Sequence, residues 1–485
     1  MSAASTGAPA RIWRSERPFV VALGVGVLLR VLVQYAFPPA FVFSDGPTYL
    51  GFVDHLAPSP DRPVGYGVLL WALAQVDRGV DVVAVLQHLL GLVTAVIAYA
   101  LLRRWGVSAR VATLGVLPLL FDEMELVIEH SVLSDVLFDL LVVLAVAFLA
   151  WRRTPRVWTT AVAGLLLGVS AVVRLVGEPA LLGAAVFLVV VATSWRSRLL
   201  QVAVVLVAYA VPVTAYAAWY HHEHHVWAVT ESSGRALYMR TTAFVDCSRF
   251  TVPDYERVLC PTEPLGSRQE PTYYGWHDPE VIYLKPPAGM TRNEVMKDFA
   301  RRAIRAQPVD YARVVGRDVA LGFWAPRRID YFEYDTQYKW NFTHYVDYVP
   351  TPLWTQPAYA EHGGRMPSTR HPVADVLDWY GRIVYVPGPL MLVLLGLAVA
   401  GLVVRRPAGA PRTRPLTFLT LSLGVGFVLV PDLTAEFVWR YQLPALVLLP
   451  MSAALAWTRL RGREPVDGAS RGLSQDGTRA TASTD

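Results

Sequence analysis

The sequence predicts a mainly α-helical membrane protein: a bundle of about ten transmembrane helices that carries one mixed α/β extracytoplasmic domain. Hydrophobic residues make up 54% of the 485 residues and charged residues only 17%, with a mean hydropathy of +0.35. Soluble domains carry about 25% charged residues, and several stretches here reach the roughly 20 apolar residues that cross a bilayer. The composition excludes an ordinary soluble protein, so the net charge of +5 does not indicate nucleic acid binding.

The first apolar run covers 19–37 and follows Arg11, Arg14 and Arg17. It resembles a signal peptide, but it is too long and no small-residue cleavage site follows, so we interpret it as an uncleaved first span. The apolar segment 64–76 is too short to cross and is expected to lie along the membrane surface. The other expected spans are 82–102, 111–127, 132–151, 157–173, 179–194, 199–219, 384–404, 416–430 and 438–457.

The arginines predict the orientation. If the N-terminus is cytoplasmic, every predicted cytoplasmic loop is basic, which agrees with the positive-inside rule. These loops hold Arg103, Arg104, Arg110, Arg152, Arg153, Arg156, Arg196, Arg198, Arg405, Arg406, Arg412, Arg414, Arg459, Arg461 and Arg463. We therefore expect a multi-pass protein of a bacterial plasma membrane, with both termini in the cytoplasm and a large loop, 220–383, outside.

The expected organisation has five parts. They are a cytoplasmic N-terminus (1–17), a transmembrane module (18–219) with its first outer loop at 38–81, the extracytoplasmic domain (220–383), the C-terminal transmembrane helices (384–458) and a disordered cytoplasmic tail (459–485).

The extracytoplasmic domain is rich in Tyr, Trp, Pro and charge. Two helices are expected, at 290–307 with Thr291 as its cap and at 310–323, whereas the aromatic runs between 324 and 357 fit strand or loop. Cys247 and Cys260 would close a loop of about 14 residues, the two cysteines included. Outside the cytoplasm they can form a disulfide worth about 3 kcal/mol, and two free thiols are the alternative.

Four motifs follow one another along the chain. FVFSDGPTYL at 41–50, with RPVGYGVLLW at 62–71, places Asp45 in the first outer loop. HSVLSDVLF lies at 130–138, GVSAVVRLVGEP at 168–179 and RYQLPALVLLP at 440–450. Together they resemble the membrane-embedded GT-C glycosyltransferases, in the branch of the protein mannosyltransferases and aminoarabinose transferases. The resemblance covers roughly 18–220 and 384–458; Asp135 stands where that family more often has Glu, and two extra residues separate Arg174 from Glu178.

The resemblance implies a GT-C bundle that moves a sugar from a polyprenyl-phosphate donor to an acceptor hydroxyl on the extracytoplasmic face, with inversion. Asp45 would be the general base, and partial desolvation at the membrane boundary is expected to raise its pKa. The alternative is a turn residue, because Ser-Asp-Gly-Pro is strong turn chemistry.

The donor phosphate needs cationic partners, and arginine matches phosphate geometry. The candidates are Arg440 and Arg174, each at the outer end of a span, and Arg62; snorkelling to the interface is the alternative. Tyr49, Tyr66, Tyr441 and Glu178 are the candidates for the donor and acceptor pocket.

These motifs establish no cofactor, and a divalent metal ion is one candidate. Glu123 and Glu129 would be its ligands; solvated loop acids are the alternative. The expected partners are a polyprenyl-phosphate sugar, membrane lipids and a glycan, lipid or protein acceptor of the cell envelope, with no nucleic acid. A transporter or flippase of lipid-linked glycans and a non-catalytic GT-C-like assembly subunit are the competing functions.

Overall fold

A computed structural model describes residues 7–324, 339–346, 355–405, 407 and 409–462. Over these ranges the chain forms helices and no strand, and its one isolated β-bridge joins Phe41 to Ser131. The prediction of a mainly helical bundle is therefore confirmed. The strand content expected of the 220–383 segment is not found in its described part, and residues 325–338 and 347–354 lie outside it.

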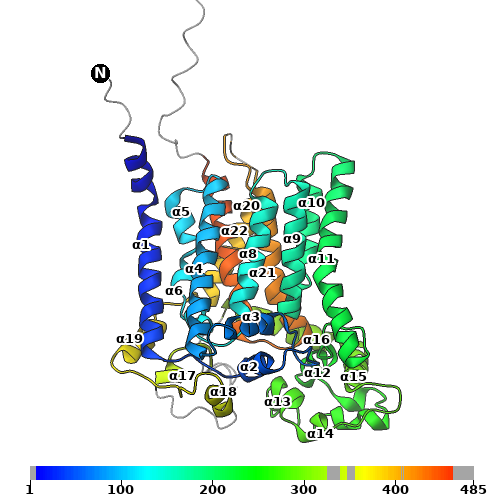
Figure 1. The fold of residues 1–485 in the computed structure, drawn as a ribbon. Helices are drawn as coiled ribbons and strands as arrows, with labels where there is room; N and C mark the ends of the chain where they lie inside the picture. Colours follow the sequence, from blue (N-terminus) through cyan, green and yellow to red (C-terminus); the bar gives the residue numbers. More distant parts are fainter. Residues whose placement is uncertain (1–6, 325–338, 347–354, 406, 408, 463–485) are drawn as a thin grey trace, which may run out of the picture.

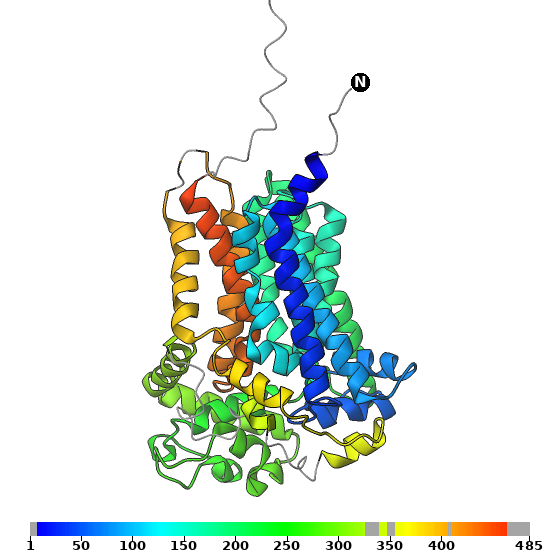
Figure 2. The same cartoon turned by 90° about the vertical axis from the view of Figure 1, so that its left-hand side faces the viewer.

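The long helices run side by side and form the bundle (Figures 1 and 2). They are α1 (Gly7–Ala36), α4 (Val80–Arg104), α8 (Asp135–Ala150), α9 (Val157–Val173), α10 (Ala180–Val191), α11 (Trp195–His224), α20 (Gly388–Val403), α21 (Arg414–Thr434) and α22 (Leu443–Arg461). The start of α1 and the end of α22 lie at one end of the bundle, and the 220–383 segment lies at the other (Figure 1).

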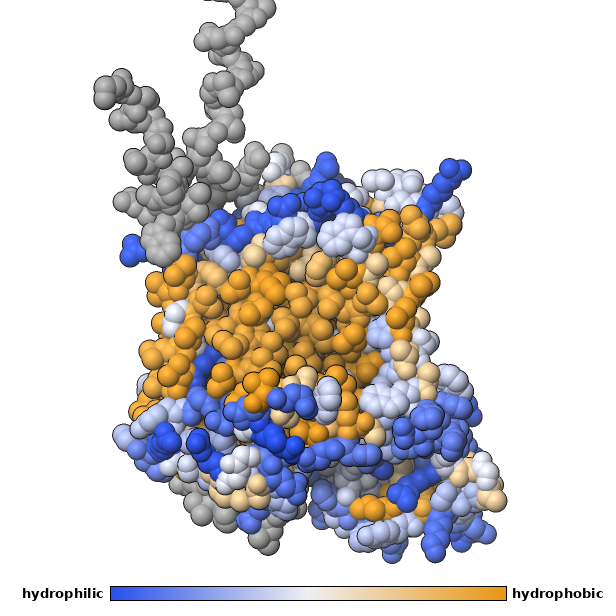
Figure 3. All heavy atoms as spheres, viewed as in Figure 1, coloured by the Kyte–Doolittle hydropathy of each residue, from blue (hydrophilic) through white to orange (hydrophobic). Residues whose placement is uncertain are grey.

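Five helical stretches are long and apolar enough to cross a membrane: Ser15–Ala36, Val80–Arg104, Trp195–His224, Arg414–Thr434 and Trp439–Arg461. The helices at 157–173, 175–191 and 388–403 are apolar but shorter. Apolar side chains cover the middle of the bundle and polar ones gather at both ends (Figure 3). The chain is thus a membrane protein, while ten crossings and the direction of each remain predictions.

The expected span at 111–127 is wrong. The chain there breaks into α5 (Ala109–Leu114), α6 (Leu117–Phe121) and α7 (Glu123–Glu129). Pro118 lies in the first turn of α6, and the Asp122 side chain caps α7 by accepting the N–H of Met124 at 2.9 Å. All of α7 is buried, so its apolar residues face protein instead of lipid.

A charged pair lies inside the bundle. Arg30 of α1 donates to Glu129 of α7 over 2.6 Å, and both side chains are almost completely buried. Arg30 also donates to the backbone oxygens of Leu119 and Leu120 at 2.8 and 3.1 Å, and the second oxygen of Glu129 lies 2.7 Å from His88 Nδ1. The pair therefore joins α1, α4, α6 and α7.

Two short helices lie across the end of the bundle that faces the 220–383 segment: α2 (Gly46–Asp54) and α3 (Gly65–Ala74) (Figure 1). The predicted surface helix at 64–76 corresponds to α3. A Cβ atom on Gly65 would lie 2.6 Å from the backbone oxygen of Val172. Only glycine allows α3 to begin this close to α9, and this contact fixes the chain that follows Arg62.

The 220–383 segment is built from short helices. They are α12 (Ser233–Thr242), η2 (Cys247–Arg249), η3 (Asp254–Leu259), α13 (Pro271–Trp276), α14 (Pro279–Ile282), α15 (Arg292–Ala306), α16 (Pro308–Trp324), α17 (Thr343–Val346), α18 (Gln356–Glu361) and α19 (Val373–Gly381). The two predicted helices are confirmed as α15 and α16, and Thr291 and Glu294 form a reciprocal cap at the start of α15. Cys247 and Cys260 form a disulfide.

Candidate functional site

The loop that leads to Asp45 is buried and held from two sides. Val132 donates its N–H to the Phe41 oxygen at 2.9 Å, and the Tyr359 hydroxyl bonds to the backbone of residues 40 and 42 at 2.8 and 2.9 Å. Ser44 has a φ of 53°, a left-handed conformation that side chains other than glycine seldom adopt. Strain of this kind persists only where neighbouring contacts enforce it, so the position of Asp45 is strongly determined.

Asp45 binds two arginines, one 17 residues away in the chain and the other 395 residues away. Its Oδ1 accepts from Arg62 Nε at 3.0 Å and Nη2 at 2.7 Å, and its Oδ2 accepts from Arg440 Nη1 at 3.1 Å. The carboxylate lies at the start of α2 but makes no capping hydrogen bond to that helix. The Asp45 side chain therefore pairs with the two arginines and not with the backbone of the turn. This disfavours the interpretation of Asp45 as an ordinary turn residue.

A second carboxylate lies behind Arg440. Asp135, in the first turn of α8, accepts from Arg440 Nη2 at 2.7 Å and from its Nε at 3.0 Å. Asp135 also accepts from Arg174, which follows the last residue of α9. A carboxylate at a helix N-terminus and a guanidinium at a helix C-terminus both complement the helix dipoles. The cluster of Asp45, Asp135, Arg62, Arg174 and Arg440 thus holds three positive and two negative charges.

The electrostatics of Asp45 differ from the prediction. Burial alone would raise the pKa of Asp45, but the charges of Arg62 and Arg440, together with their hydrogen bonds, hold this pKa well below its ordinary value. The expectation that partial desolvation makes Asp45 a stronger base is therefore wrong for this arrangement. Two nearby guanidinium groups outweigh desolvation because they stabilise the ionised form directly.

Three tyrosines predicted for the pocket border the cluster. The Tyr49 hydroxyl lies 3.0 Å from Ser134 Oγ, and its ring meets the Tyr66 ring edge-on at 4.9 Å between centroids. Tyr66 is fully buried and donates to Gln87 at 2.9 Å. The Tyr441 ring lies 5.9 Å from the Arg174 guanidinium carbon. Tyr441 therefore lies beside an arginine of the cluster, and Tyr66 packs against the buried ring of Tyr49.

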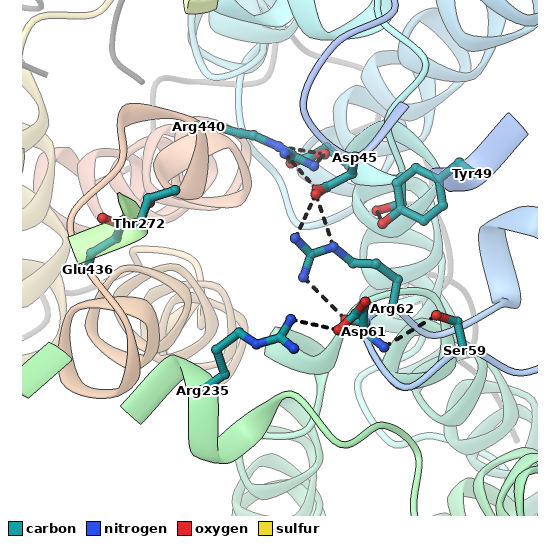
Figure 4. Close-up of polar contacts among 11 residues, drawn as sticks. Asp45, Tyr49, Ser59, Asp61, Arg62, Arg235, Thr272, Glu436 and Arg440 are labelled. Carbon is teal, nitrogen blue, oxygen red and sulfur yellow. Dashed lines mark hydrogen bonds and ion pairs between the residues drawn. The ribbon is translucent and has the colours of Figure 1, made fainter. Parts of the chain in front are cut away.

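The 220–383 segment reaches the cluster through α12 and α13. The Trp276 ring of α13 lies 4.9 Å from the Arg62 guanidinium carbon and 4.1 Å from that of Arg235, on α12. Arg235 also pairs with Asp61 at 2.6 Å, and Figure 4 shows these groups beside Arg62. The sequence did not indicate these contacts, since no motif in 220–383 pointed to the site.

Three predicted residues lie elsewhere. Glu178 is exposed, and its charge acts on Tyr209 of α11. Glu123 is buried and accepts the N–H of Phe342 at 2.8 Å, whereas Glu129 binds Arg30 and His88. Neither glutamate is a solvated loop acid, and the two carboxylates bind different partners, so they do not fit a shared metal site.

In the part of the chain that the structure describes, three side chains converge closely enough to hold an ion: Asp54, Glu361 and His362. Asp54 is already bonded to Arg78 in an exposed pair. A guanidinium at this position competes with a cation for the same carboxylate, so these residues do not indicate a metal centre.

No family model, curated protein or solved structure matches this chain. The resemblance to GT-C glycosyltransferases, which rests on four short motifs, stays a prediction. The structure does bring Asp45, Arg62, Arg174 and Arg440 together at one end of the bundle. Asp135, seen in the sequence only as a deviation from a motif, joins them.

Proposed function

We propose that this chain is a membrane glycosyltransferase that moves a sugar from a polyprenyl-phosphate donor to an acceptor hydroxyl, with inversion, at the extracytoplasmic face. The observation that carries the proposal is the cluster of three arginines and two aspartates. It gathers residues from four separate parts of the chain and keeps an excess of positive charge.

A lipid-linked phosphate suits this place. Arginine forks bind phosphate oxygens in pairs, and Arg62 and Arg440 together present such donors to one carboxylate, Asp45. A phosphate at the end of a polyprenyl tail stays at the membrane boundary, which is where the arginines cap the apolar bundle. Charged side chains at the membrane are costly, and those that a protein retains there usually serve a function.

In the site without substrate, Asp45 accepts the hydrogen bonds of Arg62 and Arg440 that the donor phosphate would need. We infer that the donor phosphate takes Arg62 and Arg440 from Asp45, while Asp135 keeps Arg174 and the rear of Arg440 in place. Asp45 is the base that the sequence indicates, and it can act as one only after this exchange, because both ion pairs lower its pKa. Attack then breaks the bond between the anomeric carbon and the phosphate oxygen, and a carboxylate takes the acceptor proton.

The proposal is tested by deleting the gene and analysing the membrane lipids. A polyprenyl-phosphate sugar is expected to accumulate, and membrane vesicles that contain the restored protein should transfer sugar from that isolated lipid and release polyprenyl phosphate. The Arg440→Gln protein should be inactive, with Arg78→Gln, from the exposed pair at the same end, as the matched control.

Three results would contradict the proposal. They are a deletion strain without any accumulated lipid-linked sugar, unchanged transfer by Arg440→Gln, and movement of the intact lipid across the bilayer without release of polyprenyl phosphate. The last result would assign the chain to the flippases.

A further inference from the structure

A buried carboxylate that no motif indicated lies beside the arginine cluster. Glu436 is in the short link between α21 and η6 (Trp439–Gln442), four residues before Arg440, and only 8% of its surface is exposed. It accepts a hydrogen bond from the Thr272 hydroxyl of α13. This contact holds its carboxylate toward the 220–383 segment.

The same short helix contacts Glu436 and Arg62. Thr272 and Trp276 are four residues apart on α13, so they lie on one face about 6 Å apart along its axis. Thr272 holds Glu436, and Trp276 stacks on Arg62. In addition, Tyr441 interacts electrostatically with four charged side chains of the site: Glu436, Arg440, Asp45 and Arg62. Figure 4 shows Glu436 and Thr272 on the opposite side of the site from Asp45 and Tyr49.

Glu436 differs from Asp45 in its partners. Asp45 is bonded to two arginines, whereas the charged groups that act on Glu436 are Glu270, which precedes α13, and Arg240 of α12. Burial raises the pKa of Glu436 to about 7, against the smaller lowering effect of the Thr272 hydrogen bond. A carboxylate of this kind exchanges protons near neutral pH, as a general base must.

We propose that Glu436, held by Thr272, is the catalytic base that takes the proton of the acceptor hydroxyl, and that Asp45 is the resting counter-ion of Arg62 and Arg440. This inference rests on the proposed function and changes only which carboxylate takes the proton. The acceptor oxygen forms its bond to the anomeric carbon while its proton passes to Glu436. The bond from the anomeric carbon to the phosphate oxygen breaks, its electron pair leaves with the polyprenyl phosphate, and the proton is later released to water.

In this proposal the donor phosphate binds at Arg62 and Arg440, and the acceptor hydroxyl approaches from the side of Glu436. Figure 4 shows Glu436 across the site from Asp45. Attack from the side opposite to the leaving phosphate is what inversion requires.

The test measures transfer from the lipid-linked sugar isolated from the deletion strain, in membrane vesicles of that strain that carry each full-length variant. Glu436→Gln should lower kcat by about 10²- to 10⁴-fold and change KM for the donor by less than about threefold. The transfer rate of the wild-type protein should rise with pH near pH 7. This rise should be absent in Glu436→Gln and present in Asp45→Asn. Formate should restore part of the activity of Glu436→Ala.

A second variant leaves the carboxylate in place. Thr272→Val removes a hydrogen bond that lowers the pKa of Glu436, so the rise should move to higher pH while activity persists. Glu280→Gln, an exposed carboxylate of α14, is the matched control. Three results would overturn the inference. The activity of Glu436→Gln could follow the wild-type pH profile, the rise in activity could stay at the same pH in Thr272→Val, or this rise could be lost in Asp45→Asn. A failure of the proposed function looks different, because the wild-type vesicles themselves would then transfer no sugar.

Discussion

Arg440 and Asp135 are 305 residues apart in the chain and form a two-point ion pair, in which Arg440 Nη2 and Nε lie 2.7 and 3.0 Å from Asp135 Oδ2. Their side chains are only 5% and 1% exposed. The pair joins η6, just before α22, to the start of α8 and leaves Arg440 Nη1 directed at Asp45. Asp135 therefore fixes the position of Arg440, and the Nη1 group that now contacts Asp45 is the one that a ligand could bind.

Asp135→Asn should destabilise the protein by about 3–5 kcal/mol, because it leaves Arg174 and the rear of Arg440 without their buried counter-ion. Adding Arg174→Gln should recover part of this loss, since the uncompensated guanidinium is then removed. Chemical denaturation in detergent micelles measures both changes. If the two losses simply add, the side chains are not coupled as the ion pair requires.

Asp45→Asn should bind farnesyl phosphate, a short stand-in for the carrier, about tenfold more tightly, or about 1.4 kcal/mol. The phosphate then no longer competes with a carboxylate for Arg62 and Arg440. Isothermal titration measures the affinity, with Asp54→Asn as the control from an exposed pair. Weaker binding would mean that Asp45 arranges the arginines for phosphate instead of blocking them.

The stability of the wild-type protein should fall as pH rises from about 4.5 to about 7, because burial in the folded protein raises the pKa of Glu436 from its ordinary 4.5 to about 7. The folded state binds more protons than the unfolded state in this window, so ionisation favours unfolding, by about 3 kcal/mol in total. Glu436→Gln should lose less stability over the same range. Denaturation at a series of pH values gives the comparison, and parallel curves for the two proteins would contradict it.

Trp276→Leu should weaken farnesyl phosphate binding by about two- to fivefold, because Arg62 loses a stacking partner worth about 0.5–1 kcal/mol. Trp379→Leu, at an exposed position of α19, is the control. A control variant that weakened binding as much as Trp276→Leu would show that the effect is not local to Arg62.

The sequence could predict the apolar helices because lipid and core both demand long runs of apolar residues. It could not predict the breaks around 111–127, where apolar residues pack inside the protein and Pro118 and Asp122 end or start helices. The acidic residues of α7 were also misjudged. Their buried partners, such as Arg30, lie far away in the chain.

The site was predictable where a charged residue stands beside an apolar span, as Asp45, Arg174 and Arg440 do. Glu436 gave the same signal, four residues before Arg440, but no motif drew attention to it. The contacts of α12 and α13 depend on how the 220–383 segment folds back, and no local pattern contains that information. The pKa direction of Asp45 also depends on which distant charges meet it.

The pair between Arg30 and Glu129 has a consequence for biosynthesis. The two residues are 99 positions apart, so α1 enters the membrane before its partner has been made. Arg30 lies six residues before the end of α1, and an unpaired arginine in an apolar helix opposes insertion by up to about 2.5–3.5 kcal/mol, the value at the helix centre. The first helix is therefore fully stable in the bilayer only after α7 has been synthesised and Glu129 can pair with Arg30. A chain that ends before Glu129 would keep an unpaired arginine in its first helix.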